Sequence, residues 1–192
     1  MCGKEAKGGK SMDALQCIAT RHSCRKFADK EVTNDTIVKL MEVVKNAPTW
    51  KNVQEVRYYA VKNDELKKRI AEEAVLGFVY NTKTISRAPV LMVETVVKGI
   101  SGYEKDGTAT TPQDSHWQSF DAGISAGTLE LAAFAMGLGS VIMGIYDDSV
   151  VKNILDIPDD QTVSGLIALG WPAAEGEGPE KKPVEDVLSF RD

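Results

Sequence analysis

Two arginines flank a serine near the start of the chain, in the run Arg21-His22-Ser23-Cys24-Arg25. Guanidinium groups present planar, two-pronged donors that match phosphate oxygens. In an extended segment, side chains two residues apart point to the same side, so Arg21, Ser23 and Arg25 would share one face. The spacing indicates a phosphate site, although the same pattern also occurs in solvated surface segments.

A second polar segment, residues 47–54 (APTWKNVQ), follows a predicted helix. Pro48 should end that helix, because the residue before a proline avoids helical backbone angles. Thr49, Asn52 and Gln54 then offer hydroxyl and amide groups on a turn. Such groups suit the edge of a flat heterocycle with alternating donors and acceptors, and they also occur in ordinary capped turns.

A glycine-rich segment, residues 137–144 (GLGSVIMG), could let a ligand approach the backbone closely. It does not read G-x-G-x-x-G, and no acidic residue follows at the spacing of a dinucleotide-binding fold, so a Rossmann site is rejected. Simple helix termination at Gly137 and Gly139 is the alternative. Near the C-terminus, the pair Lys181-Lys182 lies in a polar tail and gains a role only if the tail folds back toward the arginines.

The bulk properties describe an ordinary globular chain. Its 192 residues and 43% hydrophobic content suffice for one domain with a substantial core. The formal net charge of -5 argues against nucleic acid or an anionic membrane as the main partner. Residues 1–11 are polar, lack an apolar signal segment and are expected to form a flexible tail, which leaves 12–192 as a single domain. The longest uncharged run, 131–146, is too short to span a bilayer.

The three cysteines, Cys2, Cys17 and Cys24, contain no C-x-x-C pair. Their odd number favours neither a disulfide framework nor a zinc site, and free thiols suggest a reducing cytoplasm. Two histidines are too few for a histidine-rich metal site. A thiol redox protein that uses Cys17 and Cys24 is therefore a weak alternative.

Hydrophobic spacing predicts the elements that position these groups. The expected order is a helix from Met12 capped by Ser11, a helix from Thr33 or Asn34, a strand over 56–61, a charged and exposed helix over 64–74, a buried strand over 90–97, a long loop over 98–116, a long helix from Trp117, a strand over 140–145, a helix over 149–155 and a strand over 163–169. Helices and strands alternate with short connections, so we expect a three-layer α/β sandwich and not a regular doubly wound fold.

The longest predicted helix carries two surface patterns. Its apolar residues, Trp117, Phe120, Ile124 and Leu131 among them, recur with helical spacing. The glycine pair at 123 and 127, one turn apart, forms a smooth patch that lets another helix approach closely. The tail over 171–192 is rich in Pro, Glu and Lys, so it must lie against another surface or stay disordered.

The four segments occur in one order, RHSCRKF (21–27), APTWKNVQ (47–54), GLGSVIMG (137–144) and KKPVEDV (181–187), and that order resembles the FMN-dependent nitroreductase family. The resemblance extends from Met12 to about Leu188. It implies an α+β fold, a three-layer α/β/α sandwich whose central sheet is mixed and mostly antiparallel. It also implies a homodimer with FMN at the interface, in which the C-terminal extension wraps around the partner.

The resemblance assigns the phosphate and ribityl contacts to the first segment and to the tail. The residues implied are Arg21, His22, Ser23 and Arg25, joined at the phosphate by Lys181 or Lys182.

The resemblance assigns the flavin ring to the other two segments. Pro48, Thr49 and Asn52, from the other subunit, would line the ring, with Gln54 nearby. The Gly144 N–H would face flavin N5. No side chain is implied as a catalytic acid or base, because the flavin performs the chemistry.

This chain departs from the family pattern at three places. Thr49-Trp50 stands where Ser-Ser is common, and Trp50 is expected to narrow the pocket; Glu55-Val56 stands where Pro-Trp is common. The segment between residues 74 and 89 is short, whereas larger members carry covering helices there. The 98–116 loop would then act as a lid, with Tyr103 and Trp117 as aromatic candidates for stacking on the acceptor.

The function implied is an NAD(P)H-dependent flavin oxidoreductase. FMN would take a hydride from NAD(P)H and then reduce a small acceptor, such as a nitroaromatic or a quinone, at the same open face, which predicts ping-pong kinetics. Two alternatives remain: a flavin-carrying or regulatory module with little turnover, and a specialised family reaction such as flavin fragmentation or reductive dehalogenation.

Overall fold

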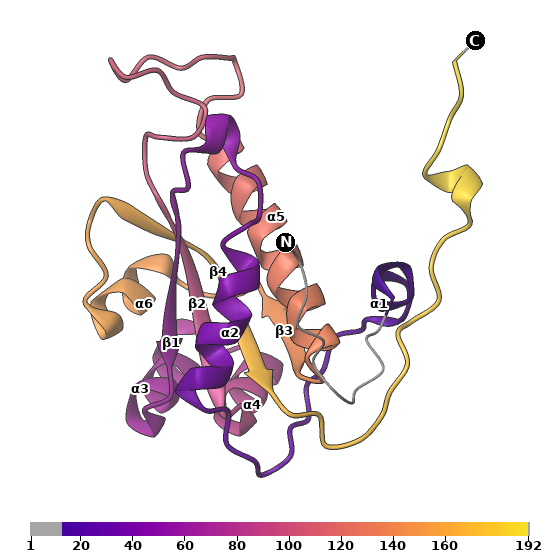
Figure 1. Ribbon diagram of the computed structural model, residues 1–192. Helices are drawn as coiled ribbons and strands as arrows, with labels where there is room; N and C mark the ends of the chain where they lie inside the picture. The colour runs from indigo at the N-terminus through magenta and orange to yellow at the C-terminus, as the bar shows by residue number, and fades with distance from the viewer. Residues whose placement is uncertain (1–12, 192) are drawn as a thin grey trace, which may run out of the picture.

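A computed structural model describes residues 13–191 of the chain (Figure 1). The expected flexible tail over 1–11 and the Ser11 cap lie outside the described residues. The centre of the fold is a four-stranded sheet in the order β1-β2-β4-β3, with each neighbouring pair antiparallel. The strands are β1 (Val56–Val61), β2 (Val90–Val97), β3 (Gly139–Met143) and β4 (Gln161–Gly170).

Helices cover both faces of this sheet (Figure 1). One layer holds α2 (Asn34–Val44) and α5 (His116–Ala135); the other holds α3 (Asp64–Arg69), a π-helical turn η2 (Ile70–Ala74), α4 (Val79–Arg87) and α6 (Asp148–Leu155). The predicted three-layer α/β/α sandwich is therefore confirmed. The four strands pair only antiparallel, so the sheet is antiparallel and not mixed; among residues 13–191 the one parallel pairing is an isolated bridge between Ser23 and Ser140, outside the strands.

The central strand β2 divides its side chains between two cores. Leu91 and Val93 join the cluster under α3, η2, α4 and α6, whereas Val90 and Met92 join the cluster under α2 and α5. This alternation follows from the two-residue period of a strand. Because both faces are covered, nearly the whole strand is buried, which explains its almost continuous apolar sequence.

Helix α2 begins where the sequence predicted. Thr33 is its N-cap, and the Thr33 side chain accepts a hydrogen bond from the Thr36 N–H. The helix buries Ile37, Leu40 and Val44 and ends at Val44. Pro48 was expected to end this helix. The helix ends four residues before Pro48, and a turn lies between the two.

Two local expectations are wrong. The segment over 64–74 is not one exposed helix: α3 gives way to η2, and Ile70 and Ala74 are buried in the core. Helix α4 lies in the 74–89 segment, for which no helix was expected. The first helix, α1 (Ala14–Thr20), is capped by Asp13, whose side chain accepts from the Gln16 N–H.

Helix α5 buries Leu129 in the core but leaves another large apolar residue outside it. Phe120 is 60% exposed, while the buried face carries polar groups such as Asp121 and Glu130. A side chain at Gly123 or Gly127 would meet no atom within 4 Å. The predicted glycine patch is therefore open along this chain, and a second helix could lie against it.

The C-terminal segment pairs briefly with the chain start and then leaves the sheet. Phe27 bridges to Pro172, and the Ala173 N–H donates to the Lys26 carbonyl. From residue 172 onward the described residues are exposed, including the short turn η3 (Val184–Asp186), and the segment extends away from the sheet (Figure 1). Within 13–191 no helix has the length and apolar character needed to cross a membrane.

Candidate functional site

The Arg21–Arg25 segment lies along the outer edge of β3. Ser23 bridges to Ser140, and the Cys24 N–H donates to the Ser140 carbonyl at 2.8 Å. The segment is therefore extended, as the sequence analysis assumed. Its side chains alternate, so neighbouring residues contact different parts of the molecule.

Arg25 and Gly144 line the same cavity, of about 370 Å³, at the end of β3. Phe78, Tyr80 and Asn81, at and near the start of α4, form another wall. Within residues 13–191, no acidic side chain forms an ion pair with Arg25. A Cβ at Gly144 would meet nothing within 4 Å, so the backbone there is open to a ligand.

Arg21 is held by an acidic partner. Its Nη1 lies 3.6 Å from Glu130 Oε2 on the buried side of α5. Burial raises the pKa of Glu130, while the Arg21 charge and a hydrogen bond from Ser140 oppose that rise. The same Nη1 is buried and has no hydrogen-bond partner among the described residues, so the guanidinium keeps unused donor capacity.

His22 and Cys24 lie in a different cavity from Arg25. Theirs, of about 340 Å³, is also lined by Gly137, Gly139 and Phe134. The His22 ring meets Phe134 edge-on with centroids 5.9 Å apart. His22 therefore does not line the cavity of Arg25 and Gly144. This separation argues against the expected flavin contact from the His22 side chain.

Cys24 packs tightly against β3 and is not activated. A Cβ at Gly139 would lie 2.6 Å from the Cys24 sulfur, and the thiol donates to the Lys26 carbonyl. Burial raises the pKa of the Cys24 thiol, which outweighs the opposing charge of Arg25. Gly137, at a φ of +79°, follows the end of α5, in agreement with simple helix termination. Of the three glycines in this segment, only Gly144 lines the Arg25 cavity.

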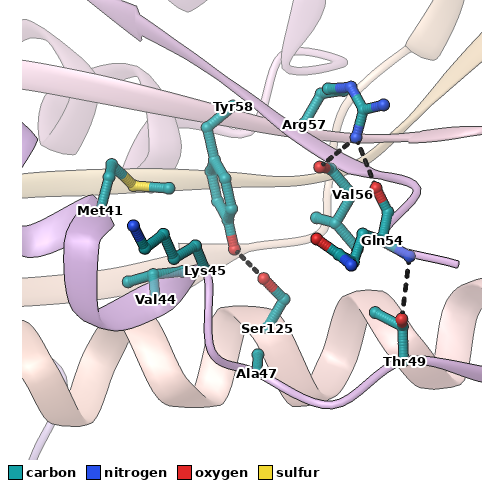
Figure 2. A pocket seen from close by; sticks show the side chains of 10 residues that line it. All are labelled: Met41, Val44, Lys45, Ala47, Thr49, Gln54, Val56, Arg57, Tyr58 and Ser125. Atoms are coloured by element: carbon teal, nitrogen blue, oxygen red, sulfur yellow. Dashed lines mark hydrogen bonds between the residues drawn. The ribbon is translucent and has the colours of Figure 1, made fainter. Parts of the chain in front are cut away.

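The 47–54 segment lines a third, separate pocket, shown in Figure 2. Thr49 and Gln54 line it, and the Thr49 hydroxyl accepts a hydrogen bond from the Gln54 N–H at 3.0 Å. The Tyr58 ring and the side chains of Met41 and Val44 from α2 also line it, and the Tyr58 hydroxyl lies 2.7 Å from the Ser125 hydroxyl. Pro48 and Asn52 are exposed beside this pocket.

The backbone of this segment is strained. Lys51, Asn52 and Gln54 all have left-handed φ angles, of 45°, 60° and 53°. Residues with side chains avoid that region, and such strain gathers at functional sites. Trp50 adds bulk: its ring lies 4.7 Å from the ring of Trp117, so Trp117 packs on this loop and donates through Nε1 to Thr111. Tyr103 lies nearby in the 98–116 loop and is half-buried.

The contacts with helix α5 show how far the 47–54 loop lies from the arginine segment. The Trp50 N–H donates to Asp121, while Arg21 pairs with Glu130, nine residues further along. At about 1.5 Å per residue, the two anchor points are roughly 13 Å apart. Within one chain, therefore, the arginine segment and the Thr49–Gln54 loop line two separate pockets.

Neither tail lysine lines the Arg25 cavity in a single chain. Lys181 and Lys182 are exposed. The tail does pass this region, because a Cβ at Gly178 would lie 4.0 Å from the Arg21 carbonyl. Lys181 follows three residues later, about 10 Å of extended chain.

Two buried acidic groups near the loop escaped the sequence analysis. Glu94, in the middle of β2, accepts a hydrogen bond from the Tyr58 hydroxyl at 2.6 Å, and its pKa is raised to about 7 by burial. Glu55 is completely buried beside Asp121. A lone glutamate in the apolar run 90–97, and a glutamate in place of the common proline at 55, were the signals that could have revealed them.

Comparison with known proteins identifies similar chains. The model of the Nitroreductase family matches residues 18–84 and 79–171. A protein named NADH dehydrogenase from Thermus thermophilus is 29% identical, over 94% of this chain and 97% of its own length. FMN reductase [NAD(P)H] from Bacillus subtilis is 25% identical, over 91% of this chain and 72% of its own length. The crystal structure of a nitroreductase family protein from Streptococcus pneumoniae superposes with a TM-score of 0.81 at 23% identity, and covers 93% of this chain and 100% of that one.

Proposed function

Because this chain belongs to the nitroreductase family, we propose that it is an FMN-dependent oxidoreductase that oxidises NAD(P)H and reduces a small acceptor such as a nitroaromatic or a quinone. Relatives named FMN reductase [NAD(P)H] and NADPH-dependent oxidoreductase support the cofactor and the hydride donor. When bound, FMN accepts a hydride from the donor and passes electrons to the acceptor.

The observation that carries the proposal is the cavity shared by Arg25 and Gly144. A guanidinium without an acidic partner among the described residues offers full charge to a phosphate, and the open Gly144 backbone offers an N–H where no side chain interferes. Ser23 lies between Arg25 and Arg21 on the same extended segment. These residues fit a flavin mononucleotide whose phosphate lies at the β3 edge.

The ring-binding residues are proposed to come from a second copy of the chain. Thr49, Asn52 and Gln54 lie on a loop about 13 Å from the arginine segment, measured along α5. Two apolar surfaces are left uncovered in one chain. They are the open glycine face of α5 and the exposed apolar residues of the tail, such as Val187 and Phe190. A homodimer in which the tail wraps around the partner would cover both and complete the site, with Lys181 or Lys182 at the phosphate.

The test is direct. Protein purified with its flavin should release FMN and not FAD on denaturation, and should oxidise NAD(P)H anaerobically when an acceptor is supplied. Double-reciprocal plots should be parallel, because donor and acceptor use one open face in turn. A protein that binds no flavin contradicts the proposal, and bound FMN without turnover would identify a flavin-carrying module.

A further inference from the structure

The buried carboxylate of Asp121 ties together three segments around the Trp50–Gln54 loop. It lies on α5, is 2% exposed, and its Oδ2 accepts from the Trp50 N–H at 2.8 Å and from the Ser101 hydroxyl at 2.7 Å. The loop and the start of the 98–116 segment are thus fixed to the same helix through one oxygen atom.

This loop needs such an anchor. Its three left-handed residues, Lys51, Asn52 and Gln54, oppose the folded conformation. Other contacts that hold it include the Thr49–Gln54 hydrogen bond, the Trp50–Trp117 stack and the exposed Lys51–Glu104 ion pair. An exposed ion pair contributes little, so the buried Trp50–Asp121 hydrogen bond is a principal constraint.

Glu55, which follows the loop directly, is completely buried against Asp121. Both of its carboxyl oxygens lack a hydrogen-bond donor among residues 13–191. Two ionised carboxylates buried side by side would repel each other strongly. One proton on Glu55 removes this conflict, because the neutral acid can donate a hydrogen bond to Asp121.

The surroundings of Glu55 favour that proton. Burial and the neighbouring Asp121 carboxylate raise the pKa of Glu55. The backbone N–H of Glu55 and, more weakly, the charge of Arg57 on β1 act in the opposite direction, and the Arg57 Nη1 is already bonded to the Gln54 and Val56 carbonyls. The charged groups that act on Glu55 are thus Asp121 from α5 and Arg57 from β1.

We propose that Glu55 and Asp121, joined by one shared proton, form a positioning pair that holds the Trp50–Gln54 loop in the conformation that presents Asn52 and Gln54 to the cofactor. The role of the loop rests on the proposed function, whereas the pair itself does not. When the proton leaves, two buried negative charges oppose each other beneath the loop, and the Trp50 anchor weakens. Loop order and flavin affinity should both fall as the pH rises.

The experiment has two readouts on the full-length protein. The first is tryptophan emission of the flavin-free protein from pH 5.5 to 8.5, since Trp50 and Trp117 report on the loop. The second is the Kd for FMN, measured by quenching of flavin fluorescence over the same range. The variants are Glu55→Gln, which is permanently neutral and keeps a donor, and Asp121→Asn, which leaves a single charge. Glu72→Gln, at an exposed position in η2, is the matched control.

The wild type and Glu72→Gln should show an emission transition, and their Kd for FMN should rise about tenfold more between pH 6 and 8 than that of Glu55→Gln, which equals ~1.4 kcal/mol. Comparison at each pH cancels the titration of the FMN phosphate itself. Asp121→Asn should also lack the transition, and it carries the test if Glu55→Gln does not fold. A transition that persists in either variant overturns the positioning pair. If the variants lose the emission transition but the wild-type protein binds no FMN, the positioning pair is supported and the proposed function is refuted.

Discussion

The Nη1 of Arg21 lies 3.6 Å from the Oε2 of Glu130. Arg21, the first of the two arginines expected to bind phosphate, is therefore already paired with an acid of its own chain. Arg25, four residues later, faces the Gly144 cavity, and no acid within residues 13–191 pairs with it. The two arginines are equivalent in the sequence pattern and different in the structure. They should therefore respond differently to mutation.

Arg25→Ala should weaken FMN binding by roughly 10- to 150-fold, because a hydrogen bond to a charged group contributes about 1.5–3 kcal/mol. Flavin fluorescence titration of the protein freed of flavin measures this. Lys26→Ala removes a neighbouring, exposed positive charge and is the matched control, for which we expect less than about a threefold change. Equal effects of the two substitutions would show that Arg25 contributes only general charge.

Arg21→Ala should lower the free energy of unfolding by about 1–3 kcal/mol, since it leaves the buried Glu130 carboxylate without its positive partner. Urea unfolding at pH 7.5 measures the loss. Adding Glu130→Gln to this variant removes the stranded charge and should restore much of the stability. If the double variant is as unstable as the single one, the ion pair is not the cause.

Glu94 should make the fold less stable as the pH rises. Its pKa is raised by burial from 4.5 to about 7, so the neutral acid is the form that the folded state favours. This contribution is fully present below about pH 4.5, where the unfolded chain is also protonated, and is lost as the pH rises through about 7. The loss amounts to at most about 3 kcal/mol, at ~1.4 kcal/mol per pKa unit.

Glu94→Gln isolates this effect from that of Glu55, which titrates in the same direction. Urea unfolding between pH 5 and 8 should show a smaller decline in the variant than in the wild type. Identical slopes for the two proteins would contradict the assignment to Glu94.

Gly127→Leu should disrupt the proposed homodimer without disturbing the chain's own fold. A Cβ there meets nothing within 4 Å, so the leucine has room in one subunit, whereas overfilling a closely packed interface costs about 1–3 kcal/mol. Sedimentation velocity at micromolar concentration should show a dimer at least about fivefold weaker, together with weaker flavin binding. Val43→Leu, at an exposed position on α2, is the control and should remain dimeric. A fully dimeric Gly127→Leu protein would exclude this face of α5 from the interface.

Local sequence signals predicted the elements whose stability is local or whose burial is complete. Thr33 marked the start of α2 because its side chain caps the helix directly. Strands β1 and β2 were predicted with their observed bounds, since runs of β-branched and aromatic residues fit a pleated, covered surface. Helix α4 escaped prediction because its N-cap, Phe78, makes no side-chain cap and its buried residues include the polar Asn81 and Thr84.

By itself, the sequence determined the family resemblance, the three layers and the alternation of the 21–25 segment, because each follows from residue type and short spacing. Only the tertiary structure decided which groups meet. Asp121 is buried because Trp50 and Ser101, 71 and 20 residues away, supply its hydrogen bonds, whereas Phe120, its neighbour on α5, is left exposed. The free energy of burying a polar group depends on partners that are distant in the chain, and no local pattern records them.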